Sequence, residues 1–267
     1  MDRFIITGAQ GFIGKRVLEE LESQGHLCIL IHEHHGWDLE LESHVEQCDG
    51  IFHIGAISDT MLCDANRMLY YNYTLSKRLF DLAEKYNKKI VYSSSAATYG
   101  IQETGYPTNI YGWSKLLAEE YGTKACERFV ALKYFNVYGP GEEHKGEMAS
   151  VAYQAWKQVN SHMTDQSFKL FPGDIKRDFV YIDDVVHANI HAMTLEQGVF
   201  DVGTGNAEEF QTLVDGMGVD IDYHDKSKIP DWYQFYTRAD KRKFMPGWKP
   251  KYNITEGTKK YREYLEK

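Results

Sequence analysis

Hydrophobic and polar positions near the start of the chain follow two different periods. Residues 4–6 form a short apolar run of the length expected for a central strand of a parallel sheet. Beyond them, Ile13, Val17 and Leu21 recur every four residues, which is the spacing of the buried stripe of a helix. Gly25 then follows as a helix-ending residue. The pattern therefore predicts a strand, a turn and a helix before Gly25.

The same two patterns continue along the rest of the chain. Apolar runs predict strands at 28–31, 50–56, 88–95 and 127–136, and helices are expected to begin near 111 and 149. Strands that alternate with helices indicate an α/β protein with a Rossmann-type, doubly wound parallel sheet. We expect residues 1–140 to form this dinucleotide-binding domain, with a returning segment near 178–205. Residues 141–267 are then a smaller C-terminal α/β substrate-binding domain.

Three glycines separate the first predicted strand from the first predicted helix. Gly8, Gly11 and Gly14 have the spacing G-x-x-G-x-x-G. The first permits a tight turn, the second lets the backbone approach a pyrophosphate, and the third lets helix and strand pack closely. The helix N-terminus adds unpaired N–H groups that favour an anion. We therefore expect a dinucleotide to contact Gly8, Gly11, Phe12, Ile13 and Gly14.

The end of the second strand carries residues suited to the adenosine ribose. Glu33 lies about 20 residues past the glycines, where a carboxylate accepts a bond from a 2′-hydroxyl. His32, His34 and His35 surround it, and a protonated imidazole would instead tolerate a 2′-phosphate. NAD and NADP therefore both remain open. Neighbouring residues of an extended stretch point to opposite faces, so we predict no metal site here.

Further cofactor contacts are expected at later strand ends. Asp38 and Leu39 follow a very short third strand, where an aspartate suits the adenine amino group. Gly55 and Ala56 end the strand at 50–56 and are placed beside the pyrophosphate and ribose. The predicted strand that ends near Tyr134 is expected to meet the nicotinamide.

Charge and composition narrow the class of partner. The 267 residues carry a formal net charge of −9, which argues against nucleic acid and anionic membranes as partners. No stretch approaches the roughly 18–20 apolar residues of a membrane span. The four cysteines are scattered without a CxxC pair, so we expect reduced thiols in a cytoplasmic protein.

Candidate proton chemistry begins at the three serines that end the 88–95 strand. Tyr111 and Lys115 follow, four residues apart, so they share one face of the predicted helix. A free tyrosine has a pKa of about 10 and is a poor base at neutral pH. A nearby ammonium and an oxidised nicotinamide would lower that pKa. We expect Tyr111 to remove a hydroxyl proton while Ser95 holds the substrate oxygen.

Several motifs together resemble a known family. The stretches TGAQGFIG, FHIGA, YYNYTLSKRLFDLA, YSSSAATYG, YGWSK and YFNVYGP resemble the extended short-chain dehydrogenase/reductases, in their nucleotide-sugar epimerase branch. KYFNVYGPGEEHKGEMASVAY, KLFPGDIKRDFVYIDDV and FDVGTGNAEEFQ resemble the ADP-L-glycero-D-manno-heptose 6-epimerases within that branch. The resemblance implies NAD(P)-dependent epimerisation of a nucleotide-diphosphate sugar by transient oxidation to a ketone, and a homo-oligomer.

The resemblance also implies roles for individual residues. Lys145 occupies the position of a second acid/base that works opposite the tyrosine. Asn72 and Tyr134 are implied on the cofactor side. The substrate side is implied to include Ser95, Asn136, His144, Arg177 and Tyr233. The Arg177 guanidinium could grip a diphosphate through two charge-assisted bonds, or form a surface ion pair with Asp174 or Asp178.

The same residues bear on three alternative functions. A 4-epimerase or 4-reductase of another nucleotide sugar would use the same Ser95, Tyr111 and Lys115. A 4,6-dehydratase uses an Asp-Glu pair after the catalytic Ser or Thr, whereas Ala96 and Ala97 stand here. A non-catalytic dinucleotide sensor does not require Ser95, Tyr111 and Lys115. The presence of all three residues therefore argues against a sensor.

Overall fold

The computed structural model describes residues 1–31, 40–100, 105–160, 167–229 and 234–267, and it divides into two compact units. Unit 1 comprises Met1–Tyr134 and Val186–Asp201, and unit 2 comprises Phe135–Val185 and Val202–Lys267. The sequence placed the division at 140 and the returning segment near 178–205. Each unit is described by itself below.

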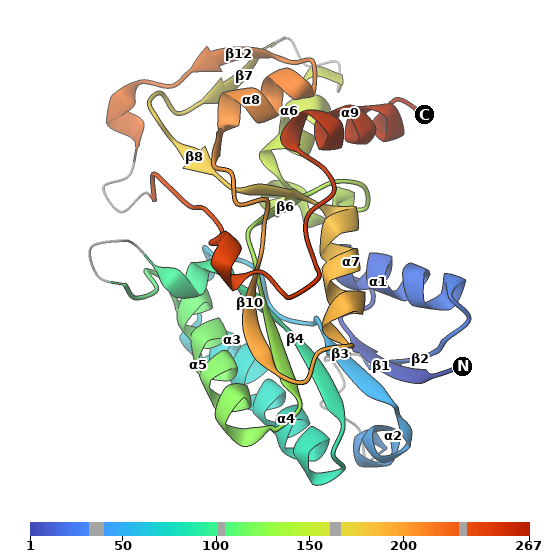
Figure 1. Ribbon diagram of the computed structural model, residues 1–267. Helices are drawn as coiled ribbons and strands as arrows, with labels where there is room; N and C mark the ends of the chain where they lie inside the picture. Colours follow the sequence, from blue (N-terminus) through green and yellow to red (C-terminus); the bar gives the residue numbers. More distant parts are fainter. Residues whose placement is uncertain (32–39, 101–104, 161–166, 230–233) are drawn as a thin grey trace. The chain divides into compact units, whose positions relative to one another are not determined.

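Unit 1 is built on a six-stranded sheet (Figure 1). Its strand order is β10-β5-β4-β3-β1-β2. The pairs β1–β2, β1–β3, β3–β4 and β4–β5 are parallel, as the doubly wound fold requires. The strands are β1 (Arg3–Thr7), β2 (Leu27–Ile31), β3 (Gly50–His53), β4 (Lys89–Ser95), β5 (Phe129–Tyr134) and β10 (Gly198–Val202).

Helices follow the strands as the periodicity predicted. The α-helices are α1 (Phe12–Ser23), α2 (Leu41–Gln47), α3 (Ala65–Leu69), α4 (Leu75–Lys85), α5 (Ile110–Ala125) and α7 (Ile182–Ala192). A π-helical turn (Tyr70–Thr74) and a 3₁₀ helix (Ala96–Tyr99) complete the set. In α1 the side chains of Val17 and Leu21 are buried, and Gly25 follows the helix with a positive φ of 81°. The predicted helix and its stop are therefore confirmed.

One face of the sheet is covered by α2, α4 and α5. Ile5 of β1, Ile51 of β3 and Ala131 of β5 pack there against Leu79 and Phe80 of α4 in one continuous core. Burying each large apolar side chain contributes about 1.5–3 kcal/mol, so this core accounts for a large share of the stability of unit 1. It also holds the strand ends, where the candidate site lies, on a rigid support.

The strand order reverses at β1. Strand β2 lies on one side of β1 and β3 on the other, although both follow β1 in the chain. In open α/β sheets a ligand binds outside the carboxyl ends of the strands at such a reversal. The loop after β1, which contains the three glycines, starts at this point.

Unit 2 consists of short strand pairs and packed helices (Figure 1). Strands β6 and β9 pair in parallel, β8 and β11 antiparallel, and β7 and β12 in parallel. The strands are β6 (Asn136–Tyr138), β7 (Ser167–Leu170), β8 (Lys176–Arg177), β9 (Phe179–Tyr181), β11 (Glu208–Glu209) and β12 (Asp220–Tyr223). The helices are α6 (Val151–Asn160), α8 (Phe210–Gly216) and α9 (Ile254–Leu265), with a 3₁₀ helix at Glu143–Met148.

A buried carboxylate organises one turn of unit 2. Asp178 accepts bonds from the backbone N–H groups of Thr204 (2.6 Å), Gly205 (2.7 Å) and Ala239 (3.0 Å). Burial raises the pKa of this carboxyl group above its usual range, and these bonds offset part of that effect. Asp178 therefore fixes the turn at Thr204 and Gly205 that follows β10.

Within the described part of the chain, none of the helices combines the length and apolar character needed to cross a membrane. All four cysteines lie in this part as free thiols.

Candidate active site

The glycine loop after β1 packs closely against the backbone that follows β3 and against the start of α1. Gly8 has a φ of 70°, and a Cβ atom on it would lie 2.5 Å from Gly55 Cα. A Cβ atom on Gly14 would lie 2.1 Å from Gly8 O, so the helix can approach the turn only without a side chain. The Gly11 N–H donates to Gly8 O at 2.9 Å and closes the turn. The roles predicted for the first and third glycines match this geometry.

The same loop fits a dinucleotide. A Cβ atom on Gly11 would meet one atom within 4 Å, Gly8 O at 3.3 Å, so this backbone faces open space. Helix α1 begins at Phe12 without a side-chain hydrogen bond at its N-cap, Gly11. Its first N–H groups, including those of Phe12, Ile13 and Gly14, suit a pyrophosphate anion. The residues that would hold NAD or NADP are thus arranged for that task.

Some predicted contacts lie outside the described residues. Glu33, Asp38 and Leu39, and the three histidines around Glu33, belong to 32–39, and Tyr233 belongs to 230–233. Gly55 is buried and Ala56 partly buried just past β3.

A relay of hydrogen bonds joins the end of β1, β3 with the segment after it, and α4. Gly55 N donates to Thr7 Oγ1 (2.9 Å), which lies 2.8 Å from His53 Nδ1. His53 Nε2 lies 2.8 Å from Ser76 Oγ, and the Ser76 hydroxyl donates its hydrogen to Asn72 O. Ser76 must therefore accept from Nε2–H, which leaves Nδ1 to accept from Thr7. Burial and the Lys115 ammonium lower the pKa of His53 to about 3, in keeping with a neutral ring.

Asn72, predicted on the cofactor side, holds the loop after β3. Its Oδ1 accepts from Ile57 N (2.8 Å), and its Nδ2 donates to Ile57 O (2.9 Å) and Ser114 Oγ (3.0 Å). These bonds join the loop to α5. Asn72 lies in the π-helical segment Tyr70–Thr74. Short π-helical segments occur frequently at functional sites.

Tyr111 and Ser95 are brought together at the ends of β4 and α5. Helix α5 begins at Ile110 because the Asn109 side chain caps it by accepting from Gly112 N at 2.8 Å. Tyr111 therefore lies in the first turn. The Ser95 hydroxyl hydrogen-bonds the Tyr111 phenol and lowers its pKa, but burial has the larger effect and raises it above the ordinary value. The expected net lowering is thus not found in the protein alone.

Lys115 lies one turn after Tyr111 and is 3% exposed. Its ammonium donates to Ser93 O at 2.7 Å and lies 5.0 Å from the centroid of the Tyr92 ring. These contacts fix the positive charge beneath the strand end. The predicted face of the helix with both Tyr111 and Lys115 is confirmed by this placement.

The three serines that end β4 serve three different neighbours. Ser93 Oγ lies 2.8 Å from the Tyr134 hydroxyl, which donates to Asn189 Oδ1 at 2.9 Å. Burial raises the pKa of Tyr134 to about 12. Ser94 Oγ donates to Glu119 Oε2 at 2.5 Å, and Ser95 Oγ accepts from Ala97 N at 3.1 Å.

In unit 2, Lys145 lies in the 3₁₀ helix at Glu143–Met148 and is partly buried. Burial lowers the pKa of its ammonium, and the Glu142 carboxylate offsets part of this. Glu142 is fully buried and accepts from Ser150 N (2.5 Å), Ser150 Oγ (2.6 Å) and Gly139 N (3.2 Å). The exposed His144 precedes Lys145. The sequence did not single out Glu142, which fixes the base of this loop.

Arg177 is 7% exposed, so its side chain is buried within unit 2. Its Nη1 donates to Lys176 O at 3.0 Å, its Nη2 donates to Gln234 O, and its guanidinium lies 5.7 Å from the Phe210 ring centroid. Asp178, the alternative ion-pair partner, is occupied by the glycine turn. The Asn136 side chain is exposed at the start of β6, whose backbone N–H donates to Asp178 O at 2.9 Å.

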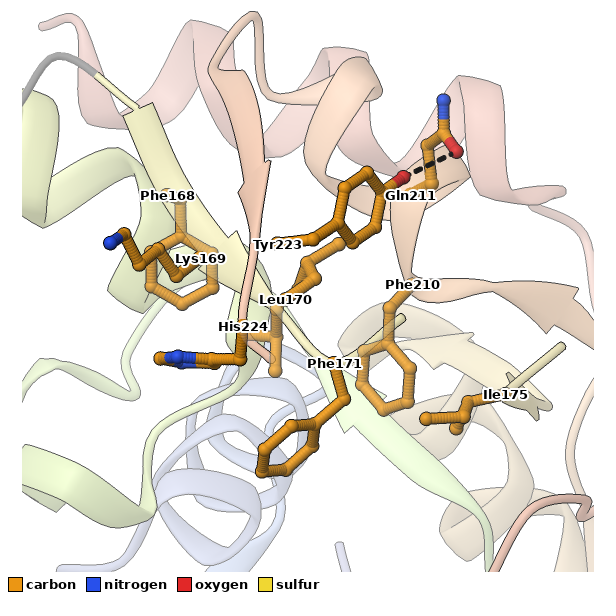
Figure 2. A pocket seen from close by; sticks show the side chains of 10 residues that line it. Phe168, Lys169, Leu170, Phe171, Ile175, Phe210, Gln211, Tyr223 and His224 are labelled. Atoms are coloured by element: carbon orange, nitrogen blue, oxygen red, sulfur yellow. Dashed lines mark hydrogen bonds between the residues drawn. The ribbon is translucent and has the colours of Figure 1, made fainter. Parts of the chain in front are cut away.

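Unit 2 also contains a cavity of about 170 Å³ that the sequence did not predict. Figure 2 shows aromatic rings around it from β7 and the residue after it, from α8, and from β12 and the residue after it. The Tyr223 hydroxyl donates to Gln211 Oε1 at 3.0 Å, and the His224 ring lies 5.5 Å from that of Phe171. The lining is mainly apolar with a few polar groups, as in sites for small organic ligands: Val151, Phe168, Lys169, Leu170, Phe171, Ile175, Phe210, Gln211, Tyr223 and His224.

Solved structures of nucleotide-sugar enzymes are similar to this chain over almost its whole length. ADP-L-glycero-D-manno-heptose-6-epimerase of Helicobacter pylori is 25% identical, with 99% of this chain and 96% of that chain covered and a TM-score of 0.83. UDP-glucose 4-epimerase of Thermotoga maritima is 26% identical, with 99% and 98% covered and a TM-score of 0.80.

UDP-N-acetylglucosamine 4-epimerase of Methanobrevibacter ruminantium shares the fold, at 22% identity and a TM-score of 0.84 over 99% of this chain and 98% of that chain. Residues 4–203 match the NAD dependent epimerase/dehydratase family. This match takes in the glycine loop, Ser95, Tyr111, Lys115, Lys145 and Arg177. The chain therefore belongs to the NAD dependent epimerase/dehydratase family, which confirms the predicted fold, the predicted family and the dependence on NAD or NADP.

Proposed function

We propose that the protein epimerises a nucleotide-diphosphate sugar, in the manner of an ADP-heptose 6-epimerase. The observation that carries this proposal is the meeting of the end of β4, which carries Ser95, with the first turn of α5, which carries Tyr111, in the same unit as a glycine loop shaped for a dinucleotide. A Cβ atom on Gly112 would lie 2.8 Å from Ala97 O, which shows how closely the two segments pack, and Ser95 lowers the pKa of the Tyr111 phenol. Lys115 supplies a fixed positive charge one turn further along α5. A binding protein for dinucleotides would require only the glycine loop.

The chemistry divides between the cofactor and the side chains. When bound, the nicotinamide accepts a hydride from the sugar carbon and returns it. Tyr111 takes the hydroxyl proton as that carbon becomes a ketone, and it gives the proton back on reduction. Ser95 orients the reacting oxygen, and Lys115 holds the nicotinamide ribose and favours the phenolate.

Lys145 is the proposed second acid/base, which would act when hydride returns to the opposite face of the carbon. Its support is its partial burial, which lowers the pKa of the ammonium and makes proton exchange near neutral pH easier. The buried Glu142 fixes the start of its helix through bonds to Ser150 and Gly139. His144 and Asn136 are proposed to contact the sugar.

The nucleotide end of the substrate is assigned to unit 2. We assign the diphosphate to Arg177, whose planar guanidinium suits phosphate oxygens, and the base to the aromatic cavity beside Phe171. Tyr233 is proposed on the sugar side. The remaining proposed cofactor contacts are Glu33, Asp38, Leu39, Gly55, Ala56, Asn72 and Tyr134.

A 4-epimerase acting on another nucleotide sugar is the second candidate. The similarity to the Thermotoga maritima UDP-glucose 4-epimerase, at 26% identity and 99% coverage, favours it. That activity would use the same Ser95, Tyr111 and Lys115 on a different carbon of the sugar.

One assay distinguishes these functions. The purified protein would be analysed for co-bound NAD or NADP, and then incubated with ADP-heptose, UDP-glucose and GDP-mannose. Epimerised ADP-heptose without net consumption of reduced cofactor is the expected result. Epimerised UDP-glucose would favour the 4-epimerase, net consumption would indicate a reductase, and no turnover of any sugar would contradict the proposal.

A further inference from the structure

A buried group of charged and polar side chains lies behind Ser95. Glu119 of α5 and Lys133 of β5, together with Ser94 and Thr98, are each at most 6% exposed. Removing charges from water is unfavourable unless they are paired and hydrogen-bonded. The cost of burying Glu119 and Lys133 is offset by the ion pair between them and by their hydrogen bonds.

Lys133 is held from three directions. Its Nζ lies 3.0 Å from Glu119 Oε1 and donates to Thr98 Oγ1 at 2.8 Å. It also lies 4.2 Å from the centroid of the Tyr99 ring, and the Tyr99 hydroxyl donates to Asp201 Oδ1 at 2.6 Å. Both Thr98 and Tyr99 belong to the 3₁₀ helix that Ser95 caps.

The pair reaches Ser95 through its carbonyl oxygen and through the side chain of the preceding residue. On one side, Thr98 accepts from Lys133 and passes its own hydroxyl hydrogen to Ser95 O at 2.8 Å. On the other side, Ser94 Oγ donates to Glu119 Oε2 at 2.5 Å. The carbonyl group of Ser95 and the side chain of Ser94 are thus both tied to the Glu119–Lys133 pair.

The pair also reaches the helix that carries Tyr111. Glu119 lies eight residues after Tyr111, so both residues, with Lys115 between them, lie along one face of α5. Glu119 therefore joins the Tyr111 face of α5 to the end of β4.

We propose that Glu119 and Lys133 are positioning residues that keep the Ser95 hydroxyl aligned with the Tyr111 phenol. The inference rests on the proposed catalytic roles of Ser95 and Tyr111. A hydrophobic pair of similar volume would pack as well, but it could not direct bonds to Thr98 and Ser94. The alignment matters because displacing a catalytic group by about 1 Å can lower the reaction rate on the order of 100-fold.

The test uses a charge-neutral double variant, Glu119→Gln with Lys133→Met, which leaves no unpaired buried charge. Lys133→Arg keeps the charge and the donors. Glu120→Gln is the matched control, because Glu120 is exposed on the same helix and pairs with Lys124 at 3.4 Å. Each variant is made with Ser95 and with Ser95→Ala, and is assayed on the sugar of the three-substrate panel that is turned over.

In the Ser95 background, kcat of the double variant should fall about 10- to 100-fold with KM nearly unchanged. In the Ser95→Ala background the further loss should be less than about twofold, because the two changes act on one alignment. The single variant Lys133→Arg should retain most of the wild-type activity, and Glu120→Gln should have the activity of the wild type. Equal losses in both backgrounds would indicate a general structural role and overturn the inference.

The pH profile gives a second readout that a structural role would not move. The Ser95 hydrogen bond lowers the pKa of Tyr111, so a poorer alignment raises it. The acidic limb of kcat against pH should therefore shift to higher pH in the double variant, as it should in Ser95→Ala. An unshifted limb counts against the positioning role.

A measurement without substrate separates this inference from the proposed function. Hydrogen exchange of a peptide covering residues 94–100 reports the Ala97 and Gly100 amides, which donate to Ser95 Oγ and Ala97 O. The double variant should lose protection at the Ala97 and Gly100 amides, and the single variant Lys133→Arg should keep it. If no sugar is turned over, the proposed function fails, and unchanged exchange in the double variant would still overturn the positioning role.

Discussion

At the scale of single residues, the two proposed acid/bases have pKa values displaced in opposite directions by the same cause. Burial raises the pKa of the Tyr111 phenol and lowers that of the Lys145 ammonium, because each shift favours the neutral form. Both groups are thereby held uncharged over a wider range of pH. Ser95 and Glu142 partly oppose these shifts.

Removing the Ser95 hydroxyl should change both rate and pH dependence. Ser95→Ala is expected to lower kcat on the order of 100-fold, because the substrate oxygen loses its partner and Tyr111 its hydrogen bond. The pKa of Tyr111 then rises, so the deprotonated form is reached at higher pH and the acidic limb moves upward. Steady-state rates from pH 6 to 10 would show this, and a limb at the same pH would contradict it.

Lys145→Ala should abolish epimerisation, because only one face of the ketone would then have a proton donor. Binding of NAD or NADP, measured by fluorescence titration, should stay within about twofold, since the glycine loop is in unit 1. Glu147→Ala is a suitable control, because Glu147 is exposed in the same 3₁₀ helix. Near-normal turnover by Lys145→Ala would remove the two-base mechanism.

At the scale of elements, the histidine relay joins β1, β3 and α4 through a neutral ring. The pKa of His53 is lowered from an unfolded value of about 6.5 to about 3. Between these values the unfolded chain binds a proton that the folded chain does not. The contribution of His53 to folded stability is therefore fully present above about pH 6.5 and is lost as pH falls toward 3.

Urea unfolding at pH 7 and at pH 5 should detect this loss. The free energy of unfolding is expected to fall by up to about 1.4 kcal/mol per pH unit from this residue alone. His53→Gln should be less stable at pH 7 but show a smaller drop between the two values. His187→Gln, exposed on α7, should keep the wild-type drop, and an equal drop in all three proteins would rule out His53 as its source.

Local sequence patterns predicted the elements well because they depend on short-range periodicity. The strand at 4–6, the helix that ends before Gly25 and the Tyr111–Lys115 face all have spacings of two to seven residues. The Glu119–Lys133 pair and Glu142 were missed, because their partners lie far along the chain or on other elements. A signal existed: Lys133 is a charge within the apolar run FVALKYF, and Glu119 continues the four-residue spacing of Tyr111 and Lys115.

At the scale of the whole molecule, the two units carry different parts of the proposed chemistry. The glycine loop, Ser95, Tyr111 and Lys115 belong to unit 1, and Lys145, Arg177 and the aromatic cavity belong to unit 2. The net charge of −9 repels anions, so each unit must hold phosphate groups through local donors. A substitution among the substrate residues of unit 2 should therefore change binding of the sugar nucleotide and leave binding of the cofactor unchanged.

Phe171→Ala tests that separation. Loss of the ring should raise KM for the sugar nucleotide about 5- to 10-fold, in keeping with about 1–1.4 kcal/mol of stacking or apolar contact, and leave NAD or NADP affinity unchanged. Tyr236→Ala, exposed in the same unit and outside the cavity, is the control. A normal KM in Phe171→Ala would place the base elsewhere.

The three serines at the end of β4 have a consequence for how the strand is placed. Each hydroxyl has its own neighbours: Tyr134 for Ser93, Glu119 for Ser94, and both Ala97 and Tyr111 for Ser95. If β4 slid by a single residue, all three hydroxyls would meet the wrong groups at once. Three identical side chains in a row thus fix the position of β4 along its neighbours, and the contacts of Ser93 and Ser94 set where the Ser95 hydroxyl lies.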